Sequence, residues 1–243
     1  MKNVYTTTKV RAGGTELKVR QVLFKGNDRV PERVAAATIS ARAWMNSARP
    51  QYLIQQTIDD MQAIFRFCFH ADATPERRNI VRSVLQTIDS ALQRDFAVKV
   101  LGGQGSTLGY VTRYYTGCIQ QTMSVYQYDA DDDLVHRRGE VHISRGILSN
   151  GDQAAITLIH EFGHKFANLR DHGWAGYFKS DSSGYEDNTL TWKQCMVNAD
   201  SYALFVYFLA NPALAKRCVP GLTRKAGSAP DQDDNWELGN LFN

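Results

Sequence analysis

His160-Glu161-Phe162-Gly163-His164 carries the strongest chemical signal in this chain of 243 residues. Residues four apart lie on one face of an α-helix, so His160 and His164 can direct two imidazole nitrogens at a single ion. Neutral imidazole is a good zinc ligand, and a catalytic zinc takes about three protein ligands and a water molecule. Glu161 lies beside the first histidine, where its carboxylate can remove a proton from that water. The spacing therefore predicts a site for one Zn²⁺ ion per chain, with Glu161 as the general base.

The residues before this motif indicate that it lies inside a helix. Residues 153–159 are apolar at helical spacing, and Gly151-Asp152 ahead of them can cap the helix N-terminus. The alternative is a buried core helix whose histidines are only hydrogen-bonded. That alternative would leave Glu161 without a partner on a largely apolar element, and unpaired carboxylates are rarely buried. A metal-binding helix is the better interpretation.

The N-terminal residues predict a hairpin. Residues 4–10 and 15–24 are rich in Val, Thr and Tyr and flank Gly13-Gly14, a pattern typical of a tight β-hairpin. We expect this hairpin to be an appendage at residues 1–30, ahead of a catalytic domain at residues 31–243.

Helical patterns follow the hairpin. The first begins at Pro31 and is interrupted at Pro50, after which residues 51–69 and residues 75–95 predict two further helices. Their apolar stripes need one another for burial, so these helices are expected to form the core scaffold.

The middle third of the chain has the composition of a small sheet that precedes the metal helix. Residues 98–101, 110–116, 122–128 and 140–144 are rich in strand-forming residues, and the last of these segments alternates. The run Gly102–Gly109 lacks the Lys-Ser/Thr pair of a phosphate loop and is interpreted as a turn. The whole pattern predicts an α+β fold that is mostly helical.

Composition excludes several classes of partner. There are 28 basic and 25 acidic residues, and the net charge of +3 gives no reason to expect nucleic-acid binding. No segment approaches eighteen consecutive apolar residues, and the N-terminus lacks the apolar run of a secretory signal. We expect a soluble protein without a membrane partner, in the cytoplasm or exported by a specialised apparatus.

The cysteines give no second metal signal. Cys68, Cys118, Cys195 and Cys218 are widely spaced and lack CxxC pairing. One or two disulfides and four buried thiols are both compatible with this spacing.

A third zinc ligand has to come from beyond the motif. The continuation HExxHxxGxxH would place a histidine at position 170, but Arg170 stands there and excludes the metzincin arrangement. An aspartate is the natural candidate. The acidic and histidine side chains available are Asp171, His172, Asp181, Glu186, Asp187 and Asp200.

Two segments after the motif carry a family resemblance. Asn198-Ala199-Asp200-Ser201 matches an Asn-Ala-Asp-Ser/Thr stretch, and residues 168–174 supply the aspartate of a GTxDxxYG-like segment as Asp171, with Trp174 at its tyrosine position. In these features the chain resembles the aspzincins, the family of deuterolysin and the peptidyl-lysine metalloendopeptidases. The resemblance covers about residues 140–208.

The resemblance implies a zincin-like metalloprotease fold in which Asp171 completes the zinc site of His160 and His164. A tyrosine of the family is thought to donate a hydrogen bond to the oxyanion that forms when water attacks the peptide carbonyl. A tryptophan cannot supply that hydroxyl, so Tyr177 is the nearest substitute. If Asp181 were the third ligand instead, Tyr185 would be the natural partner.

The resemblance also points to a substrate pocket. In the lysine-specific members the aspartate that matches Asp200, together with a glutamate three residues later, lines the pocket for a basic side chain. Here the second position is Ala203, and a single carboxylate can still pair with Lys or Arg. The alternative is that Asp200 caps a helix or orients a zinc histidine.

The leading hypothesis is therefore a zinc metalloendopeptidase that acts on protein or peptide substrates, with a preference for basic residues. A rival is a metal-dependent amide hydrolase or toxin-type effector with a narrow target. A second rival is a non-catalytic interaction protein on a zincin scaffold. The intact Glu161 argues against the last, because an inactive scaffold has no physical need for the base.

Overall fold

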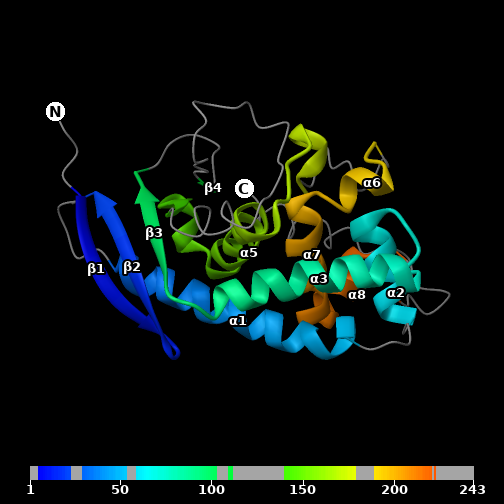
Figure 1. The fold of residues 1–243 in the computed structure, drawn as a ribbon, viewed down its shortest axis with the longest axis horizontal. Helices are drawn as coiled ribbons and strands as arrows, with labels where there is room; N and C mark the ends of the chain where they lie inside the picture. Colours follow the sequence, from blue (N-terminus) through cyan, green and yellow to red (C-terminus); the bar gives the residue numbers. More distant parts are fainter. Residues whose placement is uncertain are drawn as a thin grey trace. The chain divides into compact units, whose positions relative to one another are not determined.

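The computed structural model describes residues 5–22, 29–53, 59–102, 109–111, 140–178, 189–220 and 222. These residues form a sheet unit, drawn from residues 1–42 and 87–168, and a helical unit, drawn from residues 43–86 and 169–243. The elements in chain order (Figure 1) are β1 (Tyr5–Ala12), β2 (Thr15–Val22), α1 (Val30–Leu53), α2 (Asp59–Phe69), α3 (Pro75–Leu92), β3 (Phe96–Leu101), β4 (Gly109–Val111), β5 (Val141–Ser144), η1 (Gly146–Ser149), α5 (Gly151–Ala167), η2 (Gly173–Gly176), α6 (Trp192–Cys195), α7 (Ala199–Ala210) and α8 (Pro212–Cys218).

The N-terminal hairpin forms as the sequence predicts. β1 and β2 are antiparallel, with Ala12 opposite Thr15 at the turn. Gly13 has a φ of +60°, in the left-handed region that glycine adopts without a steric penalty. Gly13 is therefore the residue that allows so tight a connection.

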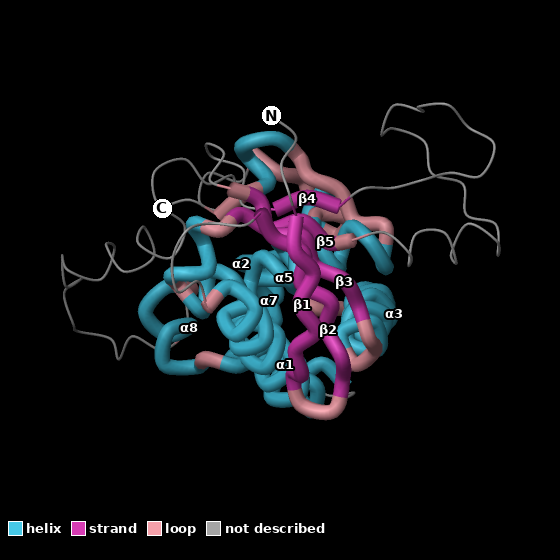
Figure 2. Tube along the Cα trace, turned by 90° about the vertical axis from the view of Figure 1, so that its left-hand side faces the viewer, coloured by secondary structure: helices cyan, strands magenta, loops and turns pink. Residues whose placement is uncertain are grey.

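The hairpin is part of a larger sheet. β2 pairs in parallel with β3, β3 pairs in parallel with β5, and β4 is antiparallel to β5, which gives the order β1-β2-β3-β5-β4. Figure 1 shows β1, β2 and β3 side by side, and Figure 2 shows β5 and β4 continuing the same sheet. The domain boundary expected at residue 30 stays a prediction. The pairing of β2 with β3 weighs against it, because it places the hairpin in the same sheet as later strands.

β5 forms where the alternating residues 140–144 predict a strand, and it is buried along its whole length. All four residues of Val141–Ser144 are buried. The strand is paired on both sides, and α5 packs against it. A strand enclosed in this way has no solvent face on which polar residues could alternate.

The other expected strands are found in part. Residues 98–101 lie in β3, and of residues 110–116 the structure describes the two that lie in β4. Residues 122–128 lie outside the described residues. The turn predicted over Gly102–Gly109 does not include Gly109, because Gly109 is the first residue of β4.

A buried arginine ties the hairpin to the end of α3. Arg42 donates from Nε to the carbonyl oxygen of Leu92 at 2.7 Å, and its guanidinium also donates to the carbonyl oxygen of Ala12 and to Oγ1 of Thr15. Burial lowers the pKa of Arg42, and the charge of Asp95 opposes that shift. These bonds give each guanidinium nitrogen of Arg42 an acceptor, and the residue is only 8% exposed.

Aromatic rings from α2 and α7 form the core of the helical unit. The ring centroid of Phe65 lies 4.7 Å from that of Phe69 and 5.7 Å from that of Phe205, and Phe69 lies 5.1 Å from Tyr202. The tilted and edge-to-face arrangements are those that aromatic pairs prefer. This packing fixes α7, which begins at the Asn-Ala-Asp stretch that the sequence singled out.

The expected helix break at Pro50 is wrong. α1 continues through Pro50 to Leu53. A proline removes one backbone hydrogen bond and crowds the preceding turn, but here only three further residues of helix follow it. The second predicted helix, residues 51–69, is described as α2 from Asp59 onward, and the third corresponds to α3.

The described cysteines are thiols. Cys68 and Cys195 are buried and Cys218 is half-buried, and these three described cysteines form no disulfide. Burial raises the pKa of Cys68 well above its ordinary value and raises that of Cys195 to about 12. Cys118 lies outside the described residues.

Candidate metal centre

The HExxH motif lies in α5, and this helix is capped one residue earlier than the sequence indicates. The side chain of Asn150 accepts hydrogen bonds from the backbone N–H groups of Asp152 and Gln153, each at 3.2 Å. Asn150 has an extended backbone, as an N-cap residue should. Gly151 and Asp152, expected as the cap, are instead the first two helical residues.

α5 is buried where it carries the motif. It packs against β4 and β5, and residues 153–165 are buried. The ring of Phe162 lies 4.8 Å from that of Phe96 in β3, which anchors the helix to the sheet. As a result Glu161 is only 3% exposed, and His160 and His164 are 7% and 8% exposed.

The two histidines face each other across one helical turn. Their Nε2 atoms are 2.9 Å apart. Two nitrogens bound to one tetrahedral zinc at about 2.0–2.1 Å are roughly 3.3 Å apart, so the pair fits a shared ion after a small outward movement. The i, i+4 spacing thus brings the two imidazole rings together on one helical face, as the sequence predicts.

Asp171 follows the helix after a short turn. Asn168 ends α5 in the left-handed conformation, with φ of 55°, and its N–H donates to the carbonyl oxygen of Gly163. The ligand atoms of His160, His164 and Asp171 lie within 4.8 Å of one another. Two imidazoles and a carboxylate are a donor set that suits zinc.

The backbone next to Asp171 is fixed by a short β-bridge. The N–H of Arg170 donates to the carbonyl oxygen of Val197 at 2.7 Å, and the N–H of Ala199 donates to the carbonyl oxygen of Arg170 at 2.9 Å. This bridge holds the aspartate's chain segment beside the start of α7.

The fold resembles that of a solved peptidase structure. No family model and no curated protein matches the chain. The solved structure of a zinc peptidase from Grifola frondosa matches 77% of this chain and 99% of its own, with a TM-score of 0.52 and 17% sequence identity. The chain shares the fold of that peptidase. This confirms the expected α+β, zincin-like architecture.

Asp200 is buried at the start of α7 and touches the loop that carries Tyr177. Its Oδ2 accepts a hydrogen bond from the backbone N–H of Phe178 at 2.8 Å. Asp200 is 5% exposed, whereas Tyr177 is half-buried. This contact ties Asp200, expected to line a substrate pocket, to the segment that carries Tyr177, expected to donate to the oxyanion.

Asn198 contacts the segment that carries Tyr177, and the sequence analysis gave it no role. It is fully buried, and its Nδ2 donates to the carbonyl oxygen of Gly176 at 2.8 Å. A Cβ atom on Gly176 would lie 2.8 Å from Oδ1 of Asn198, so a glycine is needed there. The signal was present, because Asn198 opens the Asn-Ala-Asp-Ser stretch, but only Asp200 was given a role.

The remaining ligand candidates are less favoured or lie outside the described residues. His172 is half-buried and does not belong to the cluster of His160, His164 and Asp171. The other expected candidates, Asp181, Tyr185, Glu186 and Asp187, lie outside the described residues.

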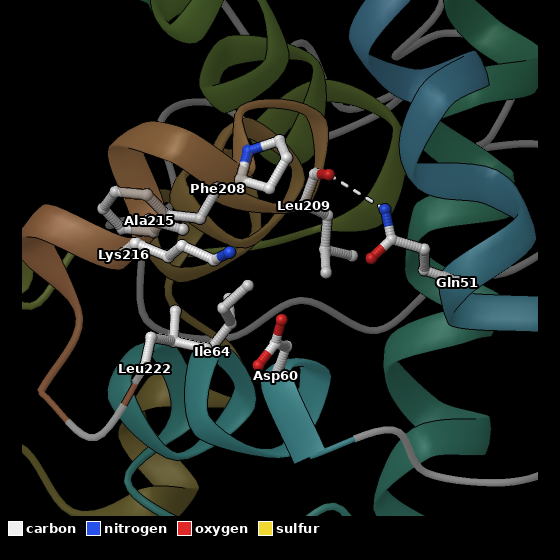
Figure 3. A pocket seen from close by; sticks show the side chains of 9 residues that line it. Gln51, Asp60, Ile64, Phe208, Leu209, Ala215, Lys216 and Leu222 are labelled. Carbon is white, nitrogen blue, oxygen red and sulfur yellow. Dashed lines mark hydrogen bonds between the residues drawn. The ribbon is translucent and has the colours of Figure 1, made fainter. Parts of the chain in front are cut away.

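None of the candidate site residues lines the small pocket in the helical unit. Its lining includes Ile64, Phe208 and Leu209, with the charged side chains of Asp60 and Lys216 (Figure 3). The cavity volume is about 50 Å³, room for a few water molecules. Its lining offers no cluster of metal ligands.

In the part of the chain that the structure describes, no helix is both long and apolar enough to cross a membrane.

Proposed function

We propose that this protein is a zinc-dependent endopeptidase of the aspzincin type, in which His160, His164 and Asp171 bind one zinc ion. The observation that carries the proposal is the convergence of these three side chains at the end of an HExxH helix within a zinc-peptidase fold. Three such ligands leave a fourth position for the water that a hydrolase needs.

Glu161 is the proposed general base. Zinc, when bound, would lower the pKa of its water and polarise the substrate carbonyl. The carboxylate of Glu161 accepts the proton of that water and returns it to the departing amine. Because Glu161 is almost fully buried, this transfer takes place where bulk water competes little.

Tyr177 is the proposed donor to the oxyanion. The backbone is held on both sides of it, since the carbonyl of Gly176 accepts from Asn198 and the N–H of Phe178 donates to Asp200. A phenol on a fixed backbone loses little conformational freedom when it meets the developing charge. The alternative pair, Asp181 and Tyr185, remains a competing proposal.

Metal content is the first test of the proposal. The purified protein should contain about one zinc ion per chain, should lose it to a chelator together with hydrolysis of heat-denatured casein, and should recover both on addition of Zn²⁺. Elemental analysis and a cleavage assay on the same samples measure this. A chain that takes up no zinc would favour the interaction-protein alternative. A zinc-bound chain that cleaves neither casein nor a peptide library would favour a hydrolase with a narrow target.

Asp200 is proposed to act on the substrate, either by lining a pocket for Lys or Arg or through the Tyr177 loop. We expect Asp200→Asn to lower kcat by roughly tenfold with zinc retained, because the bond to Phe178 loses its charge assistance. Peptide-library cleavage by both proteins separates the two roles. A preference for basic residues that flattens in the variant assigns the pocket, whereas an unchanged preference with reduced kcat assigns loop positioning, the result that the Phe178 contact favours.

A further inference from the structure

Gly109 lies directly against the carboxylate of Glu161. It is the first residue of β4, pairs with Ile143 of β5, and belongs to a strand that packs against α5. A Cβ atom built on Gly109 would lie 2.6 Å from Oε1 of Glu161 and 3.0 Å from its Cδ and Cγ atoms. Carbon atoms prefer separations of about 3.5–4.0 Å, so no larger residue fits without a shift.

The requirement for glycine at this position comes from the contact and not from the backbone. Among the described residues the glycine with positive φ is Gly13, so Gly109 has no conformational need to lack a side chain. Glycine weakens a strand, and its presence often marks a close approach by another group. Here that group is the proposed catalytic carboxylate.

The carboxylate is the part that would yield. The backbone of β4 is held by its pairing with β5 over Gly109, Tyr110 and Val111. The side chain of Glu161 ends in rotatable bonds, so turning it is the easiest relief for an added methyl group. A side chain at position 109 would thus displace the base before it disturbed the sheet.

We propose that Gly109 is a positioning residue for the general base. The bare backbone of β4 forms a wall that limits the rotamers of Glu161 and keeps its carboxylate where it can accept the proton. This inference rests on the proposed function, because it assumes that Glu161 is the base. It gives the last residue of the glycine-rich run a role in catalysis without contact with the substrate.

The kinetic test is Gly109→Ala. The variant should keep its zinc and its circular dichroism spectrum, and kcat should fall at least tenfold with little change in KM. Gly151→Ala is the matched control, because a Cβ atom there meets nothing within 4 Å, and it should keep full activity. A Gly109→Ala protein with more than half of the normal kcat would overturn the inference.

Double variants separate this role from a merely structural one. If Gly109 acts through Glu161, Gly109→Ala should not lower the residual rate of Glu161→Gln any further. In a urea unfolding series, Gly109→Ala should lower the midpoint of the wild-type chain, but not that of Glu161→Ala, where the carboxylate is gone. This second cycle needs no activity.

Additive effects in both cycles would overturn the inference. An inactive wild-type enzyme would remove the proposed function and the role of Gly109 with it. An active wild-type enzyme whose variants behave additively would remove the role of Gly109 alone.

Discussion

Glu161→Gln is expected to remove most hydrolysis while leaving zinc in place. Glutamine has nearly the same shape as glutamate but cannot accept a proton, and general-base catalysis contributes roughly a hundredfold to ten-thousandfold. We therefore expect kcat to fall within that range. Zinc should stay bound, because the ligand atoms that converge belong to His160, His164 and Asp171. A fluorogenic peptide assay gives kcat, and elemental analysis of the same sample gives the metal content.

Glu32→Gln is the matched control for this substitution. Glu32 is exposed in the first turn of α1, so the same chemical change there should leave kcat and zinc unaltered. If Glu161→Gln kept more than a tenth of the activity, the water would have to be activated by another group.

Asp171→Asn should weaken zinc binding much more than Asp181→Asn does. An amide oxygen lacks the negative charge that a carboxylate brings to the ion, and loss of one of three protein ligands should lower zinc affinity on the order of a hundredfold or more. Asp171 already lies within 4.8 Å of both histidine nitrogens. Competition with a chromophoric chelator measures the affinity of each variant.

Asp152→Asn serves as the control for Asp171→Asn, because Asp152 is an exposed residue at the other end of α5. Its zinc affinity should match that of the wild-type chain. The reverse ranking of Asp171→Asn and Asp181→Asn would transfer the third ligand to Asp181 and the oxyanion role to Tyr185.

The features predicted correctly from the sequence are those with a local cause. The spacing of His160 and His164 is enough to place them on one helical face, and their Nε2 atoms are 2.9 Å apart. Gly13-Gly14 likewise predicts the hairpin, because the turn depends on its own backbone conformation. Neither prediction needs the rest of the fold.

The features that were missed depend on packing between distant segments. No pattern in the chain pairs Gly109 with Glu161, or Asp200 with the N–H of Phe178. The burial of β5 on both faces depends in the same way on its neighbours. The choice of Asn150 as the cap of α5 was missed for another reason, since the residues that follow it are also acceptable caps and only the backbone conformation selects among them.

The buried thiols of Cys68 and Cys195 can be used to measure how often the helical unit opens to solvent. The thiolate is the nucleophile that attacks an alkylating reagent, and both thiols combine burial with a raised pKa. In the native protein they can therefore be modified only when α2 or α6 opens to solvent. The rate of labelling, followed by mass spectrometry, measures how often that opening occurs, whether or not a substrate is ever found.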